Sequence, residues 1–114
     1  LKGFTNYDRN AVSGIADDVA NFGTHFKPNS LSTVVANNPM APFVDHVSSA
    51  IRSGGTLTVR GQFANKNFSS VWDARSIQGF NIISRQKGIS SEGYFMTSGK
   101  PIKGPMNEII LEKL

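Results

Sequence analysis

The stretch TVVANNPMAPFVDHVSSAIRSGGTLTVRG, from Thr33 to Gly61, decides the fold of this chain. It begins and ends with short apolar runs rich in β-branched residues, which are typical of strands buried on both faces of a sheet. Between these runs, Phe43, Val47 and Ile51 fall on one face of a helix, and Gly54 fits the residue that follows a helix end. The stretch therefore predicts a strand–helix–strand unit, in which the two strands run parallel.

Helix and strand patterns extend this unit in both directions. Upstream, apolar residues recur at helical spacing from Val12 to Phe22, which predicts a helix over about residues 8–22. Downstream, the sequence predicts a further helix within 65–78. Three strands follow through short connections, at 80–86, 94–98 and 107–114. We therefore expect an α/β fold, with a mostly parallel sheet of roughly three to five strands, flanking helices and antiparallel strands at its C-terminal edge.

The composition excludes several classes of protein. A chain of 114 residues is long enough for one compact domain, so we treat 1–114 as a single domain. It has no cysteine, which excludes disulfides, thiol catalysis and cysteine-ligated zinc. No apolar run approaches the ~20 residues that span a bilayer, so we expect no membrane anchoring in this domain. Because the first residue is Leu1, we expect a domain cut from a longer protein.

The charge of the chain is unevenly distributed. Residues 1–50 hold three bases and four acids, whereas residues 51–114 hold nine bases and four acids, a net charge of +5. A basic half favours a polyanionic partner such as RNA, DNA or a phosphate compound. The alternative is an ordinary solvated surface.

Residues 29–114 resemble the C-terminal half of a class I, S-adenosylmethionine-dependent methyltransferase. In that family a strand ends in an Asn/Asp-Pro-Pro-like loop, here Asn37–Met40, and a helix then leads to a Gly-Gly turn, here Gly54–Gly55. The family binds its cofactor with a glycine-rich loop after the first strand and an acidic residue that ends the second. This chain has no G-x-G sequence, and Asp8 and Asp17 are too close in sequence to enclose a strand, a helix and a second strand. We therefore expect the cofactor half to be missing, and no cofactor to be bound.

The chain also resembles the toxin domains at the C-terminus of contact-dependent growth inhibition proteins and related polymorphic bacterial toxins. The resemblance rests on its small, basic, cysteine-free composition and on the tail TSGKPIKGPMNEIILEKL, residues 97–114. It implies a ribonuclease that cleaves tRNA and is neutralised by a cognate immunity protein, with a host translation factor as a further partner. It also implies secretion or display at the cell surface as part of a larger protein, and action in the target-cell cytoplasm.

This resemblance makes a metal-independent toxin ribonuclease the leading expectation. Two alternatives stay open: a degenerate or truncated methyltransferase, and a non-catalytic module that binds RNA or protein. Metal-free cleavage needs an acid and a base, and His25 and His46 are the candidates because imidazole exchanges protons near neutral pH. The other interpretation makes His25 a solvated loop residue and His46 a residue at the edge of a helix face. The chain has no H-x-x-x-H sequence or paired carboxylates, so we expect no metal site.

Arg60 ends an otherwise apolar strand, where ligands gather in α/β sheets. We expect its guanidinium to bind a phosphate, or alternatively to pair with a carboxylate such as Asp45 or Asp73. Thr97, in the sequence TSGKP, is a further catalytic candidate, although a plain hairpin turn explains the same pattern. The residues expected to bind RNA are Asn38, Gln62, Phe63, Asn65, Lys100 and Lys103. Among the aromatic residues, Phe63 is the candidate for stacking on a base, whereas Phe68 and Trp72 are expected in the core.

Overall fold

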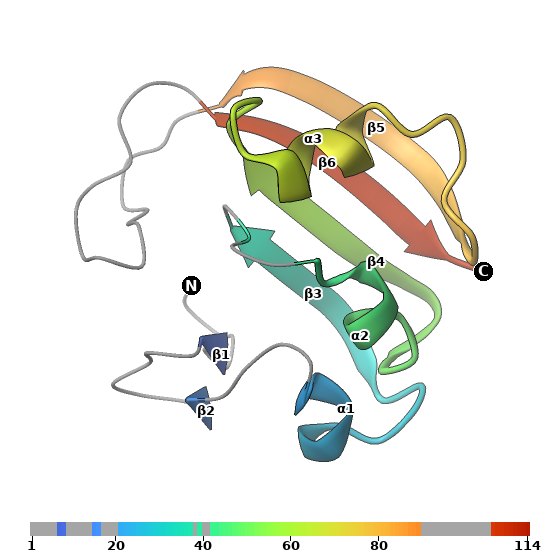
Figure 1. Ribbon diagram of the computed structural model, residues 1–114. Coiled ribbons are helices and arrows are strands. Elements are labelled where there is room, and N and C mark those ends of the chain that lie inside the picture. Colours follow the sequence, from blue (N-terminus) through green and yellow to red (C-terminus); the bar gives the residue numbers. More distant parts are fainter. Residues whose placement is uncertain (1–6, 9–14, 17–20, 38, 40–41, 90–105) are drawn as a thin grey trace.

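The computed structural model of the chain describes residues 7–8, 15–16, 21–37, 39, 42–89 and 106–114. In these residues short helices alternate with strands (Figure 1). The elements in chain order are β1 (Tyr7–Asp8), β2 (Ile15–Ala16), α1 (Phe22–His25), β3 (Leu31–Asn37), α2 (Val44–Ser48), β4 (Ile51–Gly61), α3 (Lys66–Trp72), β5 (Phe80–Ile89) and β6 (Met106–Lys113).

The main sheet has four strands in the order β3-β4-β6-β5. β3 pairs with β4 in parallel, whereas β6 is antiparallel to both β4 and β5. Three strands therefore point the same way and β6 runs against them, as the arrows in Figure 1 show. The α/β class and the antiparallel C-terminal strands are confirmed.

The position of β6 differs from the expectation. We expected the C-terminal strands at the edge of a mostly parallel sheet, but β6 lies inside the sheet and two of the three strand pairings are antiparallel. The burial of β6 gives the physical reason. Met106, Ile109 and Leu111 are all 0% exposed, and such an apolar strand is best covered when it has a neighbour on each side.

The hydrophobic core lies between one face of the sheet and the helices α2 and α3, which both lie in front of the sheet in Figure 1. Val59 of β4 and Ile109 of β6 occupy that face and pack in one cluster with Phe43, Val47 and Phe68 from the helical side. Since side chains alternate along a strand, their sequence neighbours on β4 and β6 point to the opposite face.

The predicted helix over residues 8–22 is wrong. Tyr7–Asp8 and Ile15–Ala16 form a pair of short parallel strands, and helix α1 starts only at Phe22. Ser13 and Gly14 fall in the middle of the predicted helix, and both residue types lower helix propensity. The apolar spacing alone therefore overestimated the helix.

The helix between β3 and β4 is shorter than predicted. It ends at Ser48, β4 begins at Ile51, and Gly54 adopts a φ of 82° within the strand instead of following the helix. A Cβ atom on Gly55 would lie 2.9 Å from the backbone oxygen of Ser32, so the two strands approach each other closely here. The predicted apolar face is nevertheless buried, and Ile51 is fully covered.

The predicted helix after β4 is confirmed for Lys66–Trp72. Its end is fixed by Arg85 of β5, whose Nε and Nη2 donate to the carbonyl oxygens of Trp72 and Ala74 at 3.0 and 2.8 Å. The predicted strand 94–98 lies outside the described residues. None of the helices in the described ranges has the length and apolar character needed to cross a membrane.

Candidate functional site

Two loops meet at the carboxyl ends of β3 and β4, the edge where open α/β sheets place ligands. The carbonyl oxygen of Pro39, in the loop after β3, accepts from Nδ2 of Asn65 at 2.8 Å and from Nδ2 of Asn67 at 3.3 Å. Asn65 also caps helix α3, since its Oδ1 accepts from the backbone N–H groups of Asn67 and Phe68. Pro39 is thus held at the start of α3.

Asn37, the last residue of β3, has a side-chain oxygen that lacks a partner among the described residues. Its Oδ1 is buried and accepts no hydrogen bond from the described residues. A buried acceptor without a donor costs about 1–3 kcal/mol, so such an atom requires an explanation. Because the oxygen is covered, an N–H group of a ligand reaches it only when the covering atoms move aside.

Asn37 belongs to a polar row on the sheet face opposite the core. Its register partner on β4 is Arg60, which in turn faces Glu108 of β6, and Glu108 faces Gln86 of β5. Nε of Arg60 donates to Oε2 of Glu108 at 2.7 Å, with the two side chains 21% and 15% exposed. The carboxylate partner is therefore Glu108, and neither Asp45 nor Asp73 fills that role. The contact fits the ion-pair interpretation of Arg60.

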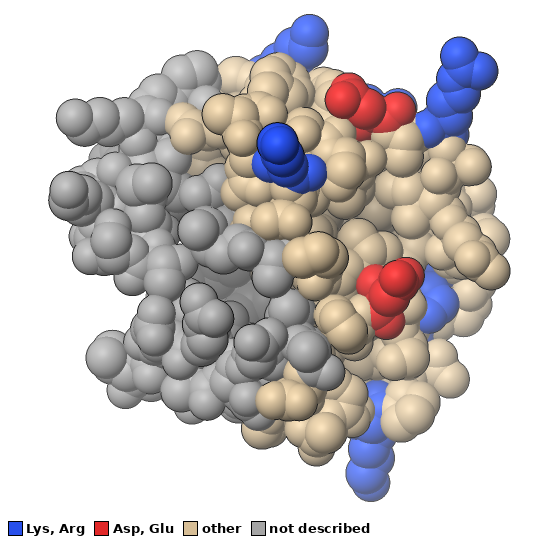
Figure 2. Space-filling view, in the orientation of Figure 1, with Lys and Arg blue, Asp and Glu red and all other residues tan. Residues whose placement is uncertain are grey.

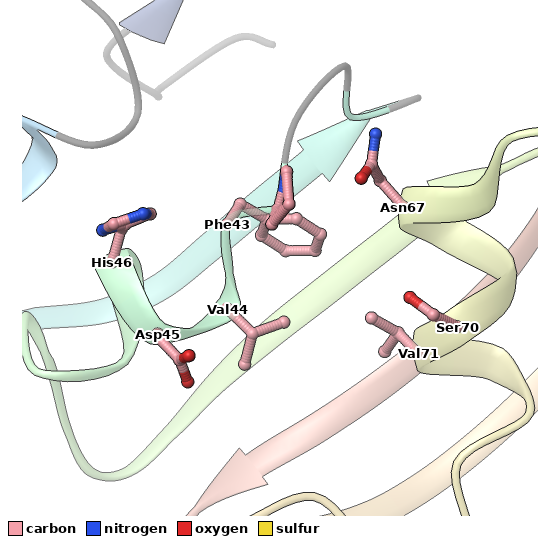
Figure 3. A pocket seen from close by; sticks show the side chains of 8 residues that line it. Phe43, Val44, Asp45, His46, Asn67, Ser70 and Val71 are labelled. Carbon is pink, nitrogen blue, oxygen red and sulfur yellow. The ribbon is translucent and has the colours of Figure 1, made fainter.

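A cavity of about 180 Å³ lies between α2 and α3. Figure 3 shows Val44 and Val71 facing each other across it, with the imidazole of His46 turned away from this gap. The lining residues are Pro42, Phe43, Val44, Asp45, His46, Asn67, Ser70 and Val71. His46 is exposed on α2, and His25 is exposed at the end of α1 and is not part of the lining. The cavity thus has both apolar and polar walls and does not bring together His25 and His46, the two candidates for proton transfer.

The residues expected to bind RNA divide into three groups. Gln62 and Phe63 lie in the loop after β4, where Phe63 is 45% exposed. Asn65 lies in the same loop but is engaged in capping α3 and holding Pro39. The others, together with the catalytic candidate Thr97, lie outside the described residues: Asn38, Lys100 and Lys103. Within the described ranges, no three His, Asp or Glu side chains gather as metal ligands would.

Sequence reasoning missed two residues that shape this edge. Asn67 is the second donor to Pro39. Its position in the sequence, two residues after the capping Asn65, was the only indication of this role. Asn107 is 8% exposed, donates through Nδ2 to the carbonyl oxygen of Gly61 at 3.3 Å and accepts from the N–H of Gly88 at 3.3 Å. It links the ends of β4 and β5 across β6, a contact that no local pattern indicates.

The geometry defines a methyltransferase-like α/β fold, and comparison with solved structures agrees. An rRNA methylase from Streptococcus thermophilus is 17% identical with a TM-score of 0.56, and the match covers 88% of this chain and 56% of that one. A putative methyltransferase from Streptococcus mutans, solved in complex with SAH, is 16% identical with a TM-score of 0.58, covering 95% and 69%. No family model matches the chain, and no curated protein matches it.

These neighbours correct the leading expectation from the sequence. The fold resembles methyltransferases, so the assignments as a growth-inhibition toxin and as a tRNA ribonuclease are wrong. The methyltransferase resemblance of residues 29–114 is confirmed as a likeness of fold. The chain spans just over half the length of the Streptococcus thermophilus protein, 56%.

The described residues do not fit a complete site for S-adenosylmethionine. The resemblance places a strand and a glycine-rich loop ahead of this half, but the full sequence has no G-x-G and the described strands ahead of β3 have only two residues each. In the four-stranded sheet, β3 is an end strand that pairs with β4 alone among the described strands.

Proposed function

We propose that this chain is the substrate-binding part of a methyltransferase-type module and that its substrate is RNA. The observation that carries the proposal is Oδ1 of Asn37 at the carboxyl end of β3, which accepts no hydrogen bond from the part of the chain that the structure describes. Nucleobases carry amino and ring N–H groups, and an amide oxygen at a fixed position is suited to accept from one of them. The methyltransferase-like fold supports this reading, as does the name of the rRNA methylase that shares it.

Three features of the chain serve substrate binding. The bonds from Asn65 and Asn67 to Pro39 hold the loop after β3 in place, so that a base meets a fixed surface. The pairing of Arg60 with Glu108 keeps the polar row beside Asn37 in register. The net charge of +5 in residues 51–114 attracts the phosphate backbone.

Binding measurements test this proposal. Single-stranded RNA should bind to the chain in a fluorescence anisotropy titration, and Asn37→Leu should weaken that binding by roughly 5–10-fold, the worth of about one hydrogen bond to a buried group. Thr33→Val is the matched control, because Thr33 lies on the same strand and the same face, away from its carboxyl end. Equal affinities for wild type and Asn37→Leu would refute the role of Asn37.

A non-catalytic RNA-binding module is the second candidate, and the lack of a glycine-rich loop favours it. Calorimetry with S-adenosylmethionine distinguishes a complete methyltransferase from both candidates, the substrate-binding part and the non-catalytic RNA-binding module. We expect no binding of the cofactor by the 114-residue chain. Tight binding would mean that the whole cofactor site lies within these residues and would overturn the substrate-part proposal. A methyl-transfer assay with a cofactor-binding half added then distinguishes the two candidates. The substrate-binding part predicts transfer of a labelled methyl group to RNA, and the non-catalytic module predicts none.

A further inference from the structure

An aromatic group lies at the carboxyl end of β4, where the chain enters α3. Phe63 and Trp72 meet in a T-shaped contact with ring centroids 5.1 Å apart, and Phe68 lies 6.0 Å from Phe63 and 5.8 Å from Trp72. Phe68 is fully buried, whereas Phe63 is 45% exposed. The inner rings therefore hold the outer ring in position while its surface remains open to solvent.

The backbone geometry keeps Phe63 at the surface. A Cβ atom on Gly61 would lie 2.8 Å from the ring of Phe68, so the end of β4 runs directly over that ring. Two residues further on, Phe63 is 45% exposed. Three large hydrophobic side chains are exposed among the described residues, and Phe63 is the aromatic one; the other two are Ile83 and Leu114.

Positive charge accompanies this exposed ring. Nζ of Lys87, on β5, lies 6.0 Å from the centroid of Phe63. This is the outer limit of a cation–π contact, so the ammonium is free to exchange the ring for another partner. Lys66, which begins α3, is also exposed. Figure 2 shows Lys and Arg side chains projecting from the part of the surface where Figure 1 has α3 and β5.

We propose that Phe63 stacks on an unpaired base of RNA while Lys87 contacts the adjoining phosphate. A fixed aromatic ring beside an exchangeable cation is the combination by which proteins bind single-stranded nucleic acid. The charge argues against an apolar protein segment as the occupant, because such a segment would leave Lys87 desolvated and without an anion.

This proposal rests on RNA as the substrate, and it adds a second contact to the one at Asn37. The loop that holds Phe63 also holds Asn65, which binds Pro39, so both contacts lie on the same edge of the sheet.

Trp72 allows the stacking site to be observed directly. It is the only tryptophan in the chain, and its ring touches that of Phe63. An oligoadenylate of about twelve nucleotides, within the size range of single-strand sites, should change the fluorescence of Trp72 as it binds. A duplex that contains the same strand should bind more weakly and leave the emission unchanged, since its bases are already stacked.

Substitutions then separate stacking from general electrostatic binding. Phe63→Leu should weaken oligoadenylate binding by roughly 5–100-fold, the usual worth of one stacked base, whereas Phe63→Trp should retain it. Ile83→Ala is the matched control, because Ile83 is 55% exposed on β5. Lys87→Gln should reduce the slope of log affinity against log salt by about 0.7, the value for one phosphate contact on a single strand.

The possible outcomes distinguish failure of the stacking site from failure of the proposed function. Normal affinity of Phe63→Leu, or equal affinity for single strand and duplex, overturns the stacking site. In that case a loss of affinity in Asn37→Leu would leave the proposed function standing. If the wild-type chain binds no RNA, both proposals fail, and an effect of Phe63→Leu on protein capture alone would point to a protein partner. The circular dichroism spectrum of each variant should match that of the wild type, which checks that the variant is folded.

Discussion

Arg60 of β4 and Glu108 of β6 face each other directly across the antiparallel ladder, with Nε 2.7 Å from Oε2. Their side chains are 21% and 15% exposed, so water screens the pair only in part. Arg60→Met should lower the free energy of unfolding by about 1–3 kcal/mol, because the carboxylate of Glu108 loses a charged partner. Urea denaturation measures the change.

A double-mutant cycle isolates this pair. The combined variant Arg60→Met/Glu108→Leu should be more stable than the sum of the two single losses predicts, because neither member of this pair is left without the other. Strict additivity of the two single effects would show that the ion pair contributes nothing to the fold.

The two roles of Asn65 can be separated by substitution. Asn65→Ala removes both the helix cap and the bond to Pro39, and should cost about 1–2 kcal/mol. Asn65→Asp keeps the capping oxygen but loses the amide donor, so α3 should remain stable while the loop after β3 loosens and RNA affinity falls. Thermal melting would contradict this scheme if Asn65→Asp and Asn65→Ala were equally destabilised.

Asn37→Leu should keep or raise the melting temperature of the chain while it lowers the affinity for RNA. Its Oδ1 is buried without a partner in the described part of the chain, so Asn37→Leu removes an unsatisfied acceptor and should leave the melting temperature equal or higher. The same variant should lose affinity for RNA. A variant that melts well below wild type would show that Asn37 is a structural residue, and Thr33→Val gives the baseline for a polar-to-apolar change on β3.

Gly61 should not tolerate a side chain. The Cβ atom of Gly61→Ala would lie 2.8 Å from Phe68, and relieving this overlap requires movement of a fully buried ring, at a cost of about 1–3 kcal/mol. Gly23→Ala provides the opposite case, since nothing lies within 4 Å of its Cβ and the residue is in helix α1. It should be neutral or stabilising by up to about 1 kcal/mol. Equal melting temperatures for the two variants would argue against the close approach of β4 and α3.

The sequence predicted those parts of the fold that depend on local patterns. The β-branched runs correspond to β3 and β4, and the apolar face from Phe43 to Ile51 is buried. The helix over 8–22 failed because apolar spacing does not register the low helix propensity of residues such as Gly14.

The candidate site was less accessible from the sequence, because its contacts join distant residues. Arg60 was recognised as significant, but Glu108 lies 48 positions away and only the order of the strands brings them together. The acceptor in the loop after β3 is the backbone carbonyl of Pro39, which has no signature in the sequence. The toxin interpretation relied on composition and tail residues, whereas the fold as a whole resembles two methyltransferase structures.

The place of β6 determines the order in which this protein can assemble during synthesis. β5 leaves the ribosome before β6, yet among the described strands its neighbour in the sheet is β6, which comes last. The β3–α2–β4 unit has its partners close in sequence and can form early, whereas β5 must wait until residues 106–113 have emerged. Until then the apolar flank of β4 is open to other chains. A stop in translation before Met106 would therefore leave β4 and β5 without the strand that joins them, and the product would be prone to aggregation.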